Sequence, residues 1–348
     1  MRWAIRWALG VALLASSLAG CNSGGGEFIA KGRKALRANN YDAAHQAFDD
    51  ALKQDPESYD GLWGKAEAYR GQAKLPDQQK LLERIMTVPK LAEAYAGVVK
   101  PALEENYRKQ AETILGTSPD KAEALLRKAI EINKRSEANT TLSELLTRDG
   151  NNLLKQAKYK EASARYAAAI ELRIARKARG ELQGKKEIAD FWARKADFMP
   201  RFEVVKNELI EAKIYDDKAK AFFVTAEAEI EGDPKDDENF EANAELDGLV
   251  AVTVALNELT WKVAGKERPE NASVAYDRAV VSVVSKNLEK RKKDHLFTYR
   301  VAVPADALFE KVFEVDEGKF EVKAPEAAAA DGGAPAPEEK PAEEKAPE

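Results

Sequence analysis

Few of the 348 side chains have the type and spacing that catalysis or metal binding requires. His45 and His295 are the two histidines, and neither belongs to a metal-spaced pair such as HExxH. No Gly-x-Ser-x-Gly turn occurs, and the acidic run at 233–238 lacks the alternating oxygen pattern of a calcium loop. We therefore expect no catalytic residue, no metal and no cofactor. A hydrolase using His295 in a Ser/His/Asp triad remains a third alternative, because triad members need not be neighbours in sequence.

Cys21 is the one cysteine, and it follows a segment with the features of a secretory signal. Arg2 and Arg6 precede a short apolar run, and small residues stand before the cysteine. The apolar run is shorter than the ~20 residues that a membrane-spanning helix needs. The sequence therefore predicts that residues 1–20 are a signal peptide removed on export. A single cysteine also excludes an intramolecular disulfide and a thiolate metal site.

The run Leu18-Ala19-Gly20-Cys21 resembles the lipobox of bacterial lipoproteins. The resemblance implies that Cys21 becomes the mature N-terminus, carries acyl chains and makes the membrane a partner through its lipid. Residues 21–26 would be the lipidated cysteine and a flexible tether. Asn22, in place of the aspartate that retains lipoproteins at the inner membrane, implies an outer-membrane location facing the periplasm if the source is Gram-negative.

The charge of the chain excludes one class of partner. Loss of the two signal arginines changes the net charge from −5 to −7. Nucleic-acid binding needs a basic face, so we expect no nucleic-acid partner. General adsorption to anionic lipid is disfavoured for the same reason, which leaves Cys21 as the expected membrane contact.

Residues 27–178 have helical periodicity and carry one motif twice. Its members are Tyr41, Ala44, Phe48 and Ala51, and then Tyr159, Ala162, Tyr166 and Ala169. The motif resembles the second helix of a tetratricopeptide repeat, with weaker copies at 122–129 and 77–89. The resemblance implies an α-solenoid over 27–178, although an unrelated helical bundle remains an alternative at 55–116. Irregular spacing between copies suggests an added helix at 91–100, ended by Pro101.

After a predicted capping or connecting helix at 179–199, residues 200–323 alternate between apolar and polar side chains. Turn signals separate short apolar runs, which predicts an antiparallel β-sandwich or barrel of roughly seven to nine strands. The expected fold class is therefore multidomain α + β. Residues 324–348 hold nine Ala, five Pro and seven acids, and we expect a disordered acidic Ala/Pro tail there.

Binding is better supported than catalysis. In tetratricopeptide arrays the first helices of successive repeats line a groove, and the resemblance places eight residues there: Arg33, Arg37, Trp63, Glu67, Arg70, Tyr107, Asn151 and Lys155. Arginine pairs with carboxylates at two points, and aromatic side chains add contact area with little loss of rotamer entropy. The expected function is a lipid-anchored extracytoplasmic scaffold that binds another envelope protein or a peptide segment, in assembly of an outer-membrane or surface complex.

An alternative assigns binding to the β-domain, which would hold a glycan or a lipid while the helical arm positions it. A basic cluster could contact such an anionic ligand, and its members are Lys286, Lys290, Arg291, Lys292 and Lys293. A solvated hairpin loop explains the same cluster, because salt screens exposed charges of this kind.

Overall fold

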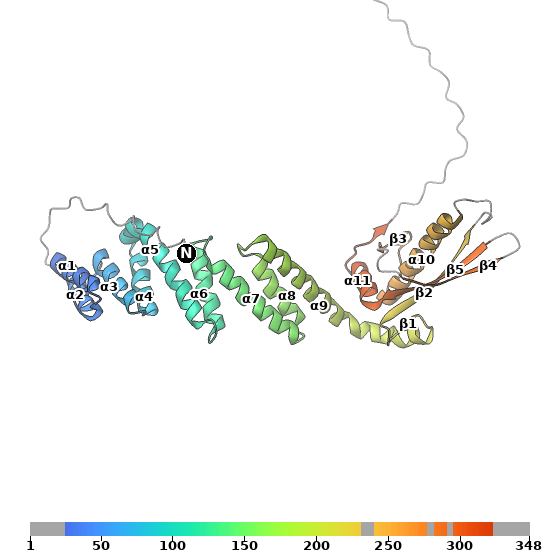
Figure 1. Cartoon of the computed structure of the whole chain (residues 1–348), viewed down its shortest axis with the longest axis horizontal. Helices are drawn as coiled ribbons and strands as arrows, with labels where there is room; N and C mark the ends of the chain where they lie inside the picture. Colours follow the sequence, from blue (N-terminus) through green and yellow to red (C-terminus); the bar gives the residue numbers. More distant parts are fainter. Residues whose placement is uncertain (1–24, 231–239, 277–281, 291–294, 323–348) are drawn as a thin grey trace, which may run out of the picture. The chain divides into compact units, whose positions relative to one another are not determined.

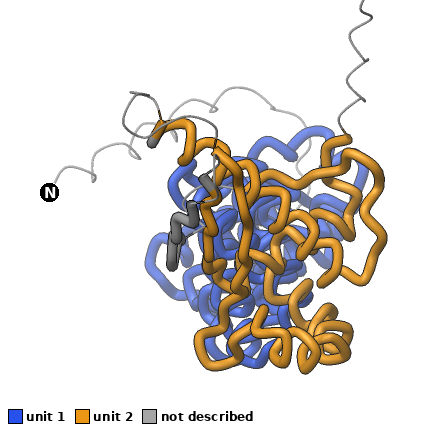
Figure 2. The backbone as a smooth tube through the Cα atoms, turned by 90° about the vertical axis from the view of Figure 1, so that its right-hand side faces the viewer, with its two compact units in different colours: residues 1–189 blue, residues 190–348 orange. Residues whose placement is uncertain are grey.

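The computed structural model describes residues 25–230, 240–276, 282–290 and 295–322 (Figure 1). The chain divides after Ala189 into two compact units, coloured separately in Figure 2. The predicted signal peptide, Cys21 and the start of the tether lie outside the described residues, as do the acidic run at 233–238, Arg291 to Lys293 and the tail from residue 324. The first helix begins at Gly25, inside the segment predicted as a tether.

The first unit consists of helical hairpins that are compatible with tetratricopeptide-like repeats. Four hairpins follow one another, and each pairs an odd-numbered helix with the next one. The helices are α1 (Gly25–Arg37), α2 (Tyr41–Gln54), α3 (Tyr59–Gly71), α4 (Leu75–Thr87), α5 (Pro89–Ile114), α6 (Pro119–Ile132), α7 (Ala138–Lys155), α8 (Tyr159–Ile170) and the start of α9 (Arg176–Glu211).

Glycine and aromatic side chains bring the two helices of the end hairpins together. Phe48 and Tyr166 are fully buried on second helices, and each ring lies against a glycine of a first helix. A Cβ atom on Gly32 would lie 2.6 Å from the Phe48 ring, and one on Gly150 would lie 2.6 Å from the Tyr166 ring. Any larger residue would push the helices apart. This contact explains why the motif recurs at both ends of the unit.

The middle of the first unit differs from the prediction. Pro101 does not end a separate helix, since α5 runs through it from Pro89 to Ile114. Proline removes one backbone donor and leaves the carbonyl four residues earlier, at Gly97, without a helical partner. Gly97 and Pro101 are both exposed, so water can reach that carbonyl. The long α5 then forms a hairpin with α6 and also contacts α4.

The second unit contains a four-stranded antiparallel sheet in the order β1-β2-β5-β4. These strands are β1 (Tyr215–Asp216), β2 (Ala221–Ile230), β4 (Ser282–Lys290) and β5 (His295–Pro304), and a separate pair joins β3 (Ala272–Ser273) to β6 (Glu321–Val322). β2 and β5 pair along their whole length, from Ala221 opposite Pro304 to Ile230 opposite His295. Helices α10 (Phe240–Ala264) and α11 (Ala305–Asp316) pack against the sheet and against each other.

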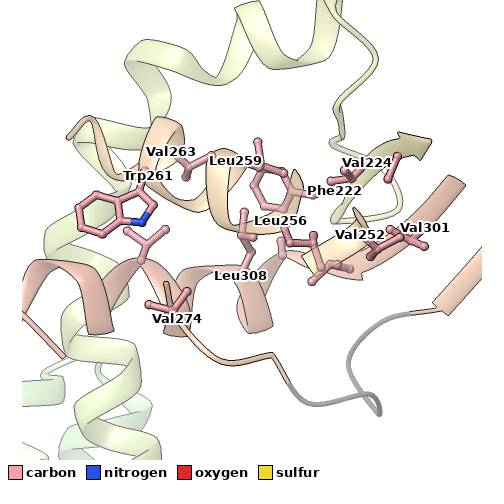
Figure 3. Close-up of a cluster of buried hydrophobic side chains, with 14 of the residues drawn as sticks. Phe222, Val224, Val252, Leu256, Leu259, Trp261, Val263, Val274, Val301 and Leu308 are labelled. Carbon is pink, nitrogen blue, oxygen red and sulfur yellow. The ribbon is translucent and has the colours of Figure 1, made fainter. Parts of the chain in front are cut away.

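The predicted β-sandwich or barrel is wrong, because the sheets of the described residues are small and not closed. Three of the short apolar runs from which strands were predicted are helical instead. The runs at 240–246 and 249–263 belong to α10, and the run at 309–322 begins within α11. In α10 the buried residues Val252, Leu256, Leu259 and Val263 recur at helical spacing, and they belong to the same core as Val224 and Val301 of the sheet (Figure 3). A long apolar run fits either period, but the run at 249–263 is longer than an ordinary strand, and this length favours a helix.

The connecting helix is longer than predicted. Residues 179–199 belong to α9, which runs from Arg176 to Glu211 and passes through Pro200. Its later half supplies Phe198 and Phe202 to the core of the second unit. There the two rings pack at T-shaped angles on Phe309, with centroids 5.3 Å and 5.1 Å away. Part of the segment assigned to the β-domain is therefore helical.

Candidate functional site

We use the name first-helix surface for the exposed faces of the first helix of each hairpin, α1, α3, α5 and α7, together with the start of α9. Helix α1 contacts α3, and Tyr59 of α3 stacks on Tyr95 of α5. Residues from successive hairpins therefore meet on it.

Two of the predicted arginines on this surface form ion pairs with acidic side chains. Arg33 of α1 reaches across to Asp60 of α3 at 2.8 Å, with both side chains about half exposed. Arg70 pairs within α3 with Glu67 at 2.5 Å. Arg37 is exposed at the end of α1. An exposed pair such as Arg33–Asp60 contributes roughly 0–1 kcal/mol, so a carboxylate of a bound partner can displace Asp60 from its arginine at little cost.

Three aromatic side chains of α3 and α5 form a cluster on the same surface. The Tyr59 and Tyr95 rings are parallel within 2°, with centroids 3.5 Å apart, and the Trp63 ring lies 5.9 Å from Tyr59. All three are half-buried. Burial raises the pKa of Tyr59 to about 12, with smaller contributions from Tyr95 and Asp60. We call Tyr59, Trp63 and Tyr95 the aromatic cluster.

Trp63 was among the predicted groove residues, and neither tyrosine was. Tyr59 stands four residues before Trp63, which places the two on the same face of a helix, and this spacing was the available signal. Tyr95 lies in the segment read as an added helix, so nothing in the sequence placed it beside Tyr59. The stacking depends on contact between successive first helices.

Tyr107 was predicted to face the groove, and the structure contradicts this. Its ring is buried, its hydroxyl donates to Glu83 at 2.6 Å, and the Lys128 ammonium lies 5.3 Å from its ring centroid. Burial, followed by the hydrogen bond to Glu83, raises the pKa of its phenol. The continuous α5 sets a different register from the one assumed, and Tyr107 points between α4 and α6.

The last two predicted groove residues lie on α7. Asn151 is half-buried, and its Oδ1 accepts hydrogen bonds from the Tyr166 hydroxyl at 2.8 Å and from Lys185 at 3.3 Å. Lys155 is exposed one turn later. Asn151 also borders a hollow of about 320 Å³, whose other lining residues are Ser143, Glu144, Thr147, Arg148, Ala178, Glu181, Leu182 and Lys185.

The basic cluster of the second unit remains a prediction. Lys286 and Lys290 belong to β4, opposite Tyr299 and His295 of β5. The described residues contain no group of three or more His, Cys, Asp or Glu side chains placed to hold a metal ion. In the same part of the chain, no helix combines the length and apolar character needed to cross a bilayer.

Comparisons with known proteins add little to this geometry. No family model matches the chain, and no curated protein matches it. Among solved structures it is similar to one described as the crystal structure of MamA protein. The two are 17% identical, the match covers 54% of this chain and 94% of that chain, and the TM-score is 0.25. A TM-score this low assigns neither a shared fold nor a function.

Proposed function

We propose that the chain is an interaction protein whose first-helix surface binds an extended segment of another protein. The observation that carries the proposal is the aromatic cluster, because its three half-buried rings lie on a surface that also presents arginines. Aromatic and arginine side chains are enriched where proteins bind one another tightly. The aromatic cluster would supply the apolar contact, and Arg33 and Arg70 would exchange Asp60 and Glu67 for carboxylates of the partner.

The proposed setting is the cell envelope. The lipobox resemblance at Cys21 supports a lipid anchor, and an anchored scaffold would bind an envelope protein or a peptide segment of one. We infer that the chain binds and positions its partner and catalyses no reaction. A Cys21→Ser variant is expected to leave the membrane fraction as a processed soluble protein or to accumulate as a precursor without lipid. Incorporation of labelled palmitate into the variant would contradict the anchor.

Site-specific crosslinking tests the surface. A photoreactive amino acid replaces Trp63 in the full chain in cells, and Trp192, a partly exposed tryptophan of the second unit, is replaced as the matched control. We expect one defined protein to be crosslinked from position 63 and not from position 192. The double change Arg33→Glu and Arg70→Glu should remove most of that product. The proposal fails if both positions give the same products, or if the charge reversals leave the crosslink intact while the protein stays folded.

A further inference from the structure

The two edges of the four-stranded sheet differ in how they are protected. β4 forms one edge, and its pairing with β5 shifts between Val283 and Ser285, an irregularity typical of protected edges. β2 lies near the other edge and is covered there only by the two-residue β1, which pairs with Phe222 and Ala221. Beyond Phe223, no described strand pairs with this side of β2. We call this stretch, from Val224 onward, the β2 edge.

The backbone of β2 is oriented to accept another strand. The Phe223 N–H donates to the Ile214 carbonyl at 2.7 Å, just before β1. Backbone groups of alternate residues in a strand point the same way, so the N–H and C=O groups of Thr225 and Glu227 point to the β2 edge. An added strand could therefore pair with both residues without disturbing the ladder between β2 and β5.

A hollow of about 600 Å³ lies beside the start of β1, where the β2 edge begins. Its floor includes the buried side chains of Val224 and Leu259, and its rim carries Thr225 and charged side chains, all of them exposed. The lining residues are Ala212, Lys213, Ile214, Phe223, Val224, Thr225, Ala255, Glu258, Leu259, Lys262 and Arg300. An apolar side chain of the added strand fits such a floor.

Two cations at the hollow are available to a ligand. Lys213 is exposed at the end of α9, and Arg300 is exposed with its guanidinium 4.9 Å from the Phe223 ring centroid. No described acidic side chain forms an ion pair with either of them. Lys262, by contrast, pairs with Glu208 at 2.9 Å. The hollow therefore favours a carboxylate near Lys213 and Arg300.

The direction of the added strand follows from β1. A strand antiparallel to β2 runs in the same direction as β1, and it must stop before Ile214, because β1 occupies the edge from there. Its carboxyl end then falls at the hollow, among Lys213 and Arg300. A parallel strand would place its positively charged amino terminus among the same two cations. Repulsion between like charges disfavours that arrangement.

We propose that the β2 edge binds the C-terminal segment of a partner protein as an added antiparallel strand. The terminal carboxylate lies at Lys213 and Arg300, and the last apolar side chain enters the hollow. A basic residue near the end of the partner segment lies opposite the exposed Glu227 of β2. A second copy of β2 fits less well, because antiparallel pairing centred on Glu227 would place that carboxylate opposite its own copy, where like charges are destabilising.

Fluorescence anisotropy tests the site with a defined probe. The probe is a labelled pool of eight-residue peptides that end in Val, carry Lys third from the end and vary elsewhere, and it is mixed with the full chain lacking only residues 1–21. We expect the free-acid pool to bind at least tenfold more tightly than the same pool with amidated ends. Lys213→Glu with Arg300→Gln should weaken binding about tenfold, whereas Lys218→Glu, on the exposed turn before β2, should not.

A variant that changes the backbone distinguishes binding by strand addition from binding by charge attraction alone. Thr225→Pro removes one N–H that points to the β2 edge and leaves the ladder to β5 intact, since proline is tolerated at strand edges. It should abolish binding while the melting temperature stays within a few degrees. Equal binding of acid and amide pools, or no binding of either, overturns the proposal. A concentration-dependent dimer that Thr225→Pro dissociates would assign the β2 edge to a second copy instead.

Discussion

Tyr59 and Tyr95 stack with parallel rings, 3.5 Å between centroids, and join two helices that are separated by a whole helix in the sequence. The contact ties α3 to α5 on the first-helix surface. Because each ring covers one face of the other, the cluster loses little freedom when a ligand binds. A preorganised aromatic surface of this kind supports binding better than scattered exposed rings would.

Removal of the Tyr95 ring should weaken the contact between α3 and α5 and disorder the aromatic cluster. We expect Tyr95→Ala to lower the free energy of unfolding by about 1–2 kcal/mol, because it removes an aromatic pair together with its packing. Tyr95→Phe keeps the ring and should stay within about 0.5 kcal/mol of the parent. Urea unfolding followed by circular dichroism measures both. Equal stability of all three proteins would show that the stack does not join the helices.

The raised pKa of Tyr59 predicts a dependence on alkaline pH. The unfolded phenol ionises near pH 10 and the folded one near pH 12, so the folded state favours the neutral side chain. This contribution to stability is complete below pH 10 and is lost as pH rises toward 12. Denaturation at fixed urea, followed from pH 9 to pH 12, should show a smaller loss in Tyr59→Phe than in the parent. An identical loss would contradict the assignment.

The repeats at the two ends of the first unit could be predicted because one contact fixes them. Phe48 and Tyr166 each need a residue without a side chain on the facing helix, and Gly32 and Gly150 supply it at a constant spacing. That requirement is local to a hairpin and therefore visible in the sequence. The register of Tyr107 was not predictable in this way, since it depends on α5 continuing through Pro101.

The second unit was harder to predict for a different reason. β2 and β5 lie in the segment where alternation predicted strands, and the alternation of β2 is strict, with Phe222, Val224 and Ala226 buried between exposed or half-buried neighbours. The sequence of α10 was predicted as strands, because apolar residues occur all around this helix and obscure its 3.6-residue period. Its exposed Leu246, Val250 and Val254 blur the helical pattern. The β2 edge depends on the shortness of β1, which only the structure reveals.

Two glycines of the first unit form a matched pair for testing the hairpin contact. A Cβ on Gly150 would lie 2.6 Å from the buried Tyr166 ring, whereas one on Gly180 of α9 meets nothing within 4 Å. We expect Gly150→Ala to destabilise the protein by about 1–3 kcal/mol through overpacking. Gly180→Ala should be neutral or stabilising by about 0.5–1 kcal/mol, because alanine favours the helix. Thermal unfolding that ranks the two variants in the opposite order would contradict the packing.

An ion pair within the second unit predicts its response to acid. Asp316 bonds to Arg201 of α9 and lies 3.0 Å from Lys266. Burial alone would raise the pKa of its carboxyl, yet the two cations outweigh burial and hold the pKa below 3.8. The ionised pair therefore adds stability above pH 3.8 that is lost as pH falls further. Asp316→Asn should lower stability at pH 6 and flatten its decline between pH 4 and pH 2, as measured by urea unfolding. Glu310→Gln, on the exposed side of α11, is the control, and a parallel decline in Asp316→Asn and the parent would exclude Asp316 as the source.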